Sequence, residues 1–179
     1  MKLGPAVLRA FSAVALCLAL SPNSYASNPI VVENSLPGTP QSQWDISGAG
    51  DPSIQGFATD ISVNVGQTIN FKIKTDAPTY TINIYRLGYY GGMGARRVVT
   101  MQASGQVQQP CLKDLTTGLV DCGNWATSAS WQVPADATSG IYFAHLIRND
   151  NQRESHIVFI VRNDNSHSAI LFQTSDETW

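Results

Sequence analysis

The chain has 179 residues, of which 43% are hydrophobic and 13% are charged, and its formal net charge is −2. This length suffices for one domain but not for two large ones. The hydrophobic content excludes a disordered chain, and because no block of basic residues stands out, a nucleic-acid partner has no electrostatic basis. The low charge content, with many small polar residues, favours an exported β-rich protein.

The first 26 residues have the pattern of a secretory signal peptide. Lys2 and Arg9 precede an apolar run over 11–20, and a small-x-small motif predicts cleavage after Ala26. A run of ten residues is too short to span a bilayer, which needs about 20. The sequence therefore predicts a secreted or periplasmic protein without a membrane span; a buried N-terminal helix is the alternative.

Cysteine usage agrees with export. Cys17 lies in the signal segment, which leaves Cys111 and Cys122. An isolated pair at this spacing in an oxidising compartment predicts a disulfide, which would stabilise the fold by roughly 3 kcal/mol in the chain-entropy model. Zinc is the alternative, but it needs three or four ligands and no histidine lies near this loop.

Short segments with a hydrophobic period of two follow one another along the chain and predict strands. They are 30–33, 61–65, 68–74, 80–87, 96–102, 130–133, 141–148 and 155–161. A turn at 66–67 is expected to join the second and third as a half-buried hairpin. Beyond the signal, no stretch keeps a helical period. The sequence thus predicts an all-β fold, an antiparallel immunoglobulin-like β-sandwich over residues 27–163.

The last predicted hairpin is apolar on both faces. A turn at Asp150-Asn151 would place His145 opposite His156, and Arg148 opposite Arg153. One face would cover the core, and the other is expected to meet something else because a solvated face should be polar. The two histidines are weak candidates for a metal site. Without an evident third ligand, a hydrogen-bonded or edge-exposed pair is the preferred interpretation, and a one-residue bulge would separate them.

The end of the chain predicts the start of another domain. A polar linker over 163–168 precedes the continuous apolar run 169–172, which is typical of a strand buried on both faces of a parallel sheet. We therefore expect residues 164–179 to be a linker and the beginning of a truncated α/β domain. The alternative is a last sandwich strand that ends a natural protein.

A glycine-rich stretch, YRLGYYGGMGAR over 85–96, is the most distinctive motif. It contains neither GxxxxGK[ST] nor GxGxxG, so a phosphate-binding loop is not indicated. Tyr85, Arg86, Tyr89 and Tyr90 form a candidate loop for binding a sugar or contacting a neighbouring domain. Packing of these tyrosines on the sandwich edge is the structural alternative. Without a GxSxG motif, the sequence indicates no catalytic residue.

This stretch resembles a characteristic segment of proteins related to the large (β) subunit of N,N-dimethylformamidase. The segments WQVP at 131–134, SGIY at 139–142 and ILFQTSDETW at 170–179 resemble further segments of that family in the same order. The resemblance spans roughly residues 28–179, which is nearly all of the chain after the signal.

The resemblance implies a β-sandwich followed by an α/β domain that hydrolyses a formamide C–N bond, with iron held by tyrosine and glutamate side chains. None of those ligands maps onto this chain, so we expect no cofactor here, iron in the missing domain, and an inactive chain on its own. Its partner would be the missing C-terminal α/β domain. The alternative function is an extracellular carbohydrate- or protein-binding module.

Overall fold

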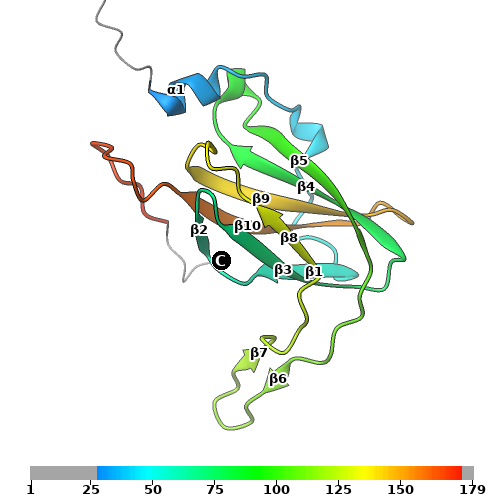
Figure 1. The fold of residues 1–179 in the computed structure, drawn as a ribbon. Helices are drawn as coiled ribbons and strands as arrows, with labels where there is room; N and C mark the ends of the chain where they lie inside the picture. Colours follow the sequence, from blue (N-terminus) through cyan, green and yellow to red (C-terminus); the bar gives the residue numbers. More distant parts are fainter. Residues whose placement is uncertain (1–27, 175–179) are drawn as a thin grey trace, which may run out of the picture.

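The computed structural model describes residues 28–174, and its fold is a sandwich of two β-sheets (Figure 1). The signal peptide predicted at 1–26 and the last five residues lie outside the described part. One sheet has the order β1 (Ile54–Ala58), β3 (Thr68–Thr75), β8 (Ala129–Gln132). The other has the order β2 (Ser62–Asn64), β10 (Glu154–Arg162), β9 (Gly140–Arg148), β4 (Thr79–Leu87), β5 (Ala95–Ser104). The predicted all-β sandwich is confirmed.

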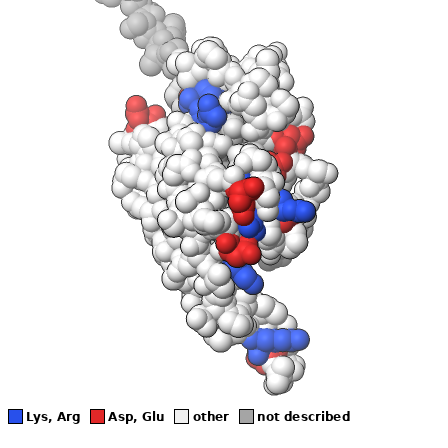
Figure 2. All heavy atoms as spheres, turned by 90° about the vertical axis from the view of Figure 1, so that its right-hand side faces the viewer, with Lys and Arg blue, Asp and Glu red and all other residues white. Residues whose placement is uncertain are grey.

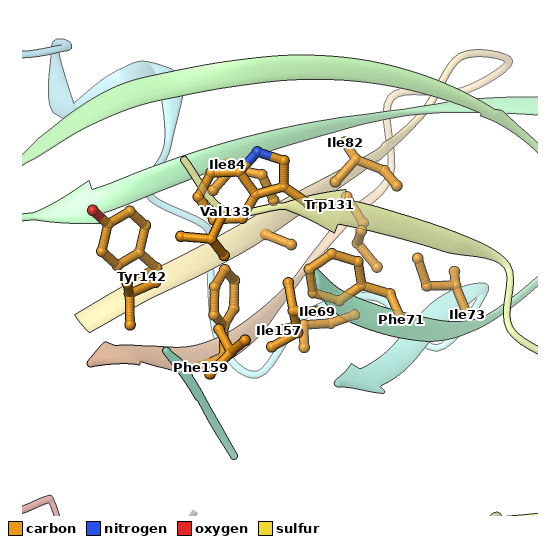
Figure 3. Packing of buried hydrophobic residues seen from close by; sticks show 14 of the residues in the cluster. Ile69, Phe71, Ile73, Ile82, Ile84, Trp131, Val133, Tyr142, Ile157 and Phe159 are labelled. Carbon is orange, nitrogen blue, oxygen red and sulfur yellow. The ribbon is translucent and has the colours of Figure 1, made fainter. Parts of the chain in front are cut away.

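The core lies between the two sheets because alternate residues of the facing strands are apolar (Figure 3). Ile69, Phe71 and Ile73 of β3 are fully buried. The ring of Phe159 on β10 packs edge-on to Phe71, at 5.6 Å between centroids, and to Trp131, at 6.1 Å. The alternation in the sequence identified these inward-facing positions correctly.

The pairing of the early strands differs from the prediction. Strands β2 and β3 form no hairpin: β2 runs parallel to β10, whereas β3 pairs antiparallel with β1 and β8. The turn between them carries the chain from one sheet to the other, so that Val63 and Ile69 reach the core from opposite sides. A period of two fixes which residues point inward but not which strand is the neighbour. Strand β1 was not predicted.

The segment predicted to open the domain as a strand is a helix, α1 (Pro29–Asn34). The side chain of Asn28 accepts a hydrogen bond from the backbone N–H of Ile30 (2.9 Å), and Pro29 occupies the first turn, where its missing N–H costs nothing. This capping signal outweighs the β propensity of the two valines. Two short 3₁₀ turns, η1 (Gln41–Gln43) and η2 (Tyr90–Gly92), follow later. No helix within residues 28–174 is long and apolar enough to cross a membrane.

The predicted disulfide is confirmed between Cys111 and Cys122, whose Cα atoms lie 4.4 Å apart. It closes a hairpin of two short strands, β6 (Leu112–Lys113) and β7 (Val120–Asp121), that projects away from the sandwich (Figure 1). The charged side chains on the face shown in Figure 2 are scattered in groups of mixed sign.

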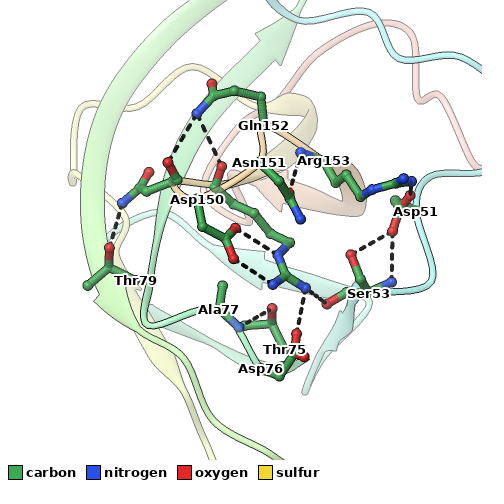
Figure 4. Close-up of polar contacts among 12 residues, drawn as sticks. Asp51, Ser53, Thr75, Asp76, Ala77, Thr79, Asp150, Asn151, Gln152 and Arg153 are labelled. Atoms are coloured by element: carbon green, nitrogen blue, oxygen red, sulfur yellow. Dashed lines mark hydrogen bonds and ion pairs between the residues drawn. The ribbon is translucent and has the colours of Figure 1, made fainter.

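The register predicted for the last hairpin is confirmed, since β9 and β10 pair His145 with His156. A buried arginine fixes its turn (Figure 4). The guanidinium of Arg148, 6% exposed, lies 2.5 Å from a carboxylate oxygen of Asp76 and 2.7 Å from one of Asp150. These bonds tie the turn to the β3–β4 connection, and the Arg148 guanidinium lowers the pKa of the Asp150 carboxyl.

The predicted strand at 169–172 is not a strand in the structure. Ile170, Leu171 and Phe172 are 85%, 91% and 76% exposed. A strand needs a neighbouring strand to satisfy its backbone groups, and none of the strands within residues 28–174 pairs with this segment. The run is therefore not the last strand of the sandwich, and its apolar side chains are left uncovered.

The two faces of β10 allow a matched test of where the core lies. Phe159→Ala should lower the free energy of unfolding by about 3–5 kcal/mol because it opens a cavity between the sheets. The neighbouring Val158→Ala, on the opposite face and 41% exposed, should cost less than about 1 kcal/mol. Urea unfolding of both variants measures the difference, and equal losses would show that the two faces are equally buried.

Candidate functional site

The four residues of the candidate loop are not brought together as a binding surface. Tyr85 and Arg86 end β4, and their side chains are 0% and 4% exposed. Tyr90, in η2, is 2% exposed, whereas Tyr89 before it is 72% exposed. Three of the four side chains are therefore largely buried. Tyr89 is exposed, and Arg86 also lines a groove beside β9 and β10.

A buried glutamate from α1 organises this region. The Tyr90 hydroxyl donates to Glu33 Oε1 (2.8 Å), and Arg96 of β5 forms an ion pair with the same oxygen (2.6 Å from Nη2). Arg86 Nη1 donates to the Tyr90 hydroxyl (3.0 Å). Glu33 itself is 8% exposed. The cluster Glu33, Arg86, Tyr90 and Arg96 thus attaches the N-terminal helix to the five-stranded sheet.

Arg86 also connects two of the distinctive sequence segments. Its guanidinium donates to the backbone oxygens of Thr138 (3.3 Å) and Ser139 (2.9 Å), just before β9. Gly140 follows with φ of +153°, and a Cβ there would lie 3.1 Å from Arg86 Nη2. The glycine of the SGIY segment therefore gives space for the arginine of the YRLG segment.

Gly88 has a similar role on the other side of the cluster. A Cβ at this position would lie 2.5 Å from the side-chain oxygen of Asn34, which accepts a hydrogen bond from the Tyr89 backbone N–H. The glycine thus lets the end of α1 approach the loop closely. Sequence reasoning missed Glu33 and Asn34, because the short segment that holds them was taken for a strand.

The chemistry of this cluster does not fit a metal ion. A tyrosine and a glutamate meet here, the side-chain types that the resemblance implies for iron, but the guanidinium groups of Arg86 and Arg96 surround them and would repel a cation. Burial raises the pKa of the Tyr90 hydroxyl, which disfavours the phenolate that a metal would need. Within residues 28–174, no three His, Cys, Asp or Glu side chains come together in a group that could hold an ion.

The two histidines lie side by side on the outer face of the five-stranded sheet, with ring centroids 5.0 Å apart. His145 is 2% exposed, and its Nε2 lies 2.8 Å from Glu154 Oε2. His145 Nδ1 and His156 Nε2 are buried without a hydrogen-bond partner. Burial, with a smaller contribution from His145, lowers the pKa of His156 to about 4.

Part of this outer face is covered by the chain itself. Residues 39–50, the strap, cross it between α1 and β1. The strap residue Trp44 packs against Phe143 of β9, at 6.0 Å between centroids, and the Tyr85 hydroxyl donates to the backbone oxygen of Gln43 (3.1 Å). Tyr85 and Phe143 stack on each other beneath it, at 5.2 Å. The sequence predicted that this face meets something else, and over this half the covering element is the strap.

The other half of the outer face remains open. We call it the outer patch: Ile61, Ile141, Val158 and Ile160. Val158 and Ile61 are 41% and 59% exposed, and Ile141 pairs with Ile160 across β9 and β10. A groove of about 480 Å³ adjoins the patch, lined among others by Ile30, Ile141, Ile160, Ile170, Leu171 and Phe172. The described structure thus leaves a continuous apolar area on one face of the sheet.

The buried anion of the cluster can be tested directly. Glu33→Gln leaves Arg96 without its carboxylate partner and should lower the free energy of unfolding by about 3 kcal/mol. Asp164→Asn removes the anion of the exposed Arg162–Asp164 pair and should cost less than about 1 kcal/mol. Thermal or urea unfolding of both variants checks this. A glutamine variant as stable as the wild type would show that the cluster does not hold α1 in place.

Comparison with known proteins supports the resemblance seen in the motifs. A family model described as "N,N-dimethylformamidase beta subunit-like, C-terminal" matches residues 81–179, more than half of the chain. The match begins within β4 and includes Arg86, Tyr90 and both histidines of the outer face. No curated protein matches the chain. The chain therefore belongs to the N,N-dimethylformamidase beta subunit-like family.

Proposed function

We propose that this chain is a secreted accessory β-sandwich of a larger dimethylformamidase-like protein. Its outer patch packs against an α/β domain of that protein, and the α/β domain hydrolyses a non-peptide C–N amide bond. The chain by itself is inactive. Its contribution is to cover and support the catalytic domain.

The open outer patch is the observation that carries this proposal. A sheet face exposed to solvent is normally polar, whereas Ile141, Val158 and Ile160 line this one. The exposed side chains of Ile170, Leu171 and Phe172 lie at the groove beside it. Contiguous apolar surface rimmed by polar residues is typical of protein interfaces. An adjoining domain would cover the patch and the segment together.

The state of the polar side chains supports an accessory role. Glu33 and Tyr90 are buried and bonded to each other and to the two arginines, and Glu154 contacts His145. The hydrogen bonds and ion pairs of these groups are made to one another and to the backbone, and so they serve to hold the fold together. The Cys111–Cys122 disulfide supports an oxidising compartment and therefore the predicted export.

A carbohydrate- or protein-binding module is the second candidate, favoured by Tyr89 alone. Its ring is 72% exposed, and Met93 nearby in the same loop is 44% exposed. Sugar-binding sites usually combine an aromatic face with several polar groups, and here Tyr85 and Tyr90 are buried instead. Tyr89→Ala would abolish binding to such a ligand and leave the interface with an α/β domain unchanged.

The test pairs the chain with the α/β polypeptide encoded downstream of it or in a neighbouring gene. Co-expression and light scattering measure whether the two form a complex, and release of amine from dimethylformamide and other formamides measures activity. We expect a complex in which amide hydrolysis requires the α/β polypeptide. Val158→Lys should weaken the complex at least about tenfold, because it places a charge in the apolar interface.

Val107→Lys is the matched control, because Val107 is 73% exposed but lies outside the outer patch. This variant should assemble like the wild type. Amide hydrolysis by the isolated chain would contradict the proposal. So would a complex that is equally stable in the two lysine variants, or specific glycan binding that depends on Tyr89 in the absence of any complex.

A further inference from the structure

The histidine pair, with His145 buried and His156 half-buried, lies beneath the strap and is not used by the proposed function. His145 and His156 face each other across the β9–β10 ladder with their rings at 86° and 5.0 Å. The strap, residues 39–50, covers them through Trp44 and Asp45, which both act on the imidazole of His156. We propose that the strap is an acid-sensitive cover, which detaches from the outer face when His156 becomes protonated.

With the strap in place, a proton added to either imidazole would find no hydrogen-bond acceptor. In this closed state, His145 Nδ1 and His156 Nε2 are buried and have no hydrogen-bond acceptor. A protonated imidazole donates from both ring nitrogens, so each new N–H would be left unsatisfied in the interior. Two adjacent imidazolium rings would also repel each other, and the cost grows as the solvent is excluded.

The groups around the histidine pair shift the pKa of His156 in opposite directions. Glu154 on β10 and Asp45 on the strap favour protonation of His156, whereas burial and His145 disfavour it. Asp60, between β1 and β2, lines a groove together with His156. The ring of Tyr85 on β4 lies 6.2 Å from the ring of His145. Burial raises the pKa of the Tyr85 hydroxyl, and Arg97 on β5 opposes this shift. Burial outweighs the carboxylates, and the pKa of His156 falls from 6.5 to about 4.

The sign of the pH effect follows from this shift. In the closed state His156 stays neutral down to about pH 4, whereas a solvated imidazole takes up a proton near pH 6.5. The equilibrium constant for any opening that hydrates the ring therefore rises as the pH falls from about 6.5 to about 4, by up to about tenfold per pH unit. Above about pH 6.5 both states are neutral and the strap remains closed.

The strap is the element that gives way. The histidines are held in strands with ladder partners on both sides, β10 by β2 and β9, and β9 by β4 and β10. The strap is mostly exposed, and it is fixed to the sheet by a few bonds near its ends and middle, such as Thr39 N–H to Ala95 O (2.8 Å) and the Tyr85 hydroxyl to Gln43 O. Segments with few such bonds open at the lowest free-energy cost. Opening would uncover Phe143 and Tyr85.

Hydrogen exchange followed by mass spectrometry tests this on the intact chain. Protection of peptides from the strap, corrected for the intrinsic pH dependence of exchange, should fall at least about tenfold between about pH 7 and about pH 4.5. Protection of β9 peptides should stay constant within about twofold. His156→Gln removes the titrating group and should abolish the loss. His167→Gln, in the exposed segment after β10, should behave like the wild type.

A second measurement applies if the glutamine variant does not fold. Proton NMR of the wild-type chain follows the imidazole signals of His156 and the indole N–H of Trp44, which donates to Thr39 O in the closed strap. We expect one shared titration midpoint below pH 6.5. The proposal is overturned if strap protection does not change with pH, if it falls equally in His156→Gln, or if the indole signal shifts independently of the histidine.

Discussion

The β9–β10 hairpin is apolar on both of its faces, and the rest of the structure is arranged around this constraint. Its inner face, with Tyr142, Leu146 and Phe159, builds the core with the three-stranded sheet. Its outer face, with Phe143, Val158 and Ile160, cannot be left to water without a free-energy cost. The fold therefore has to supply a second cover, and the chain before β1 provides it over one half.

The N-terminal region can act as this cover because a buried ion cluster fixes its starting point. Glu33 binds Arg96 and Tyr90, and Arg86 completes the network with the backbone before β9. The glycines that make the sequence motif distinctive leave room for Asn34 and for the Arg86 guanidinium. The glycine-rich motif at 85–96 thus attaches α1 to the sheet. Most polar groups of the motif are engaged in these contacts.

The sequence predicted those features that depend on local alternation. Most strands of the sandwich, their inward-facing residues, the disulfide and the His145–His156 register follow from spacing and turn geometry, whereas β1 did not. Strand neighbours did not follow, because β2 and β3 both place apolar residues inward while belonging to different sheets. The helix at Pro29–Asn34 was predicted as a strand from the β propensity of its two valines, whereas in the structure the cap at Asn28 decides for a helix. The strap was missed because irregular backbone has no period, and Glu33 because charged residues are seldom buried.

The central claim is that the open half of the outer face is an interface with an α/β domain. Hydroxyl-radical footprinting of Ile141, Val158, Ile160 and Phe172, in the isolated chain and in the assembled larger protein, tests it most directly. We expect ready modification of these residues in the isolated chain and strong protection in the assembly, with the exposed hairpin residue Leu115 modified equally in both. Equal modification of the outer patch in the two states would contradict it.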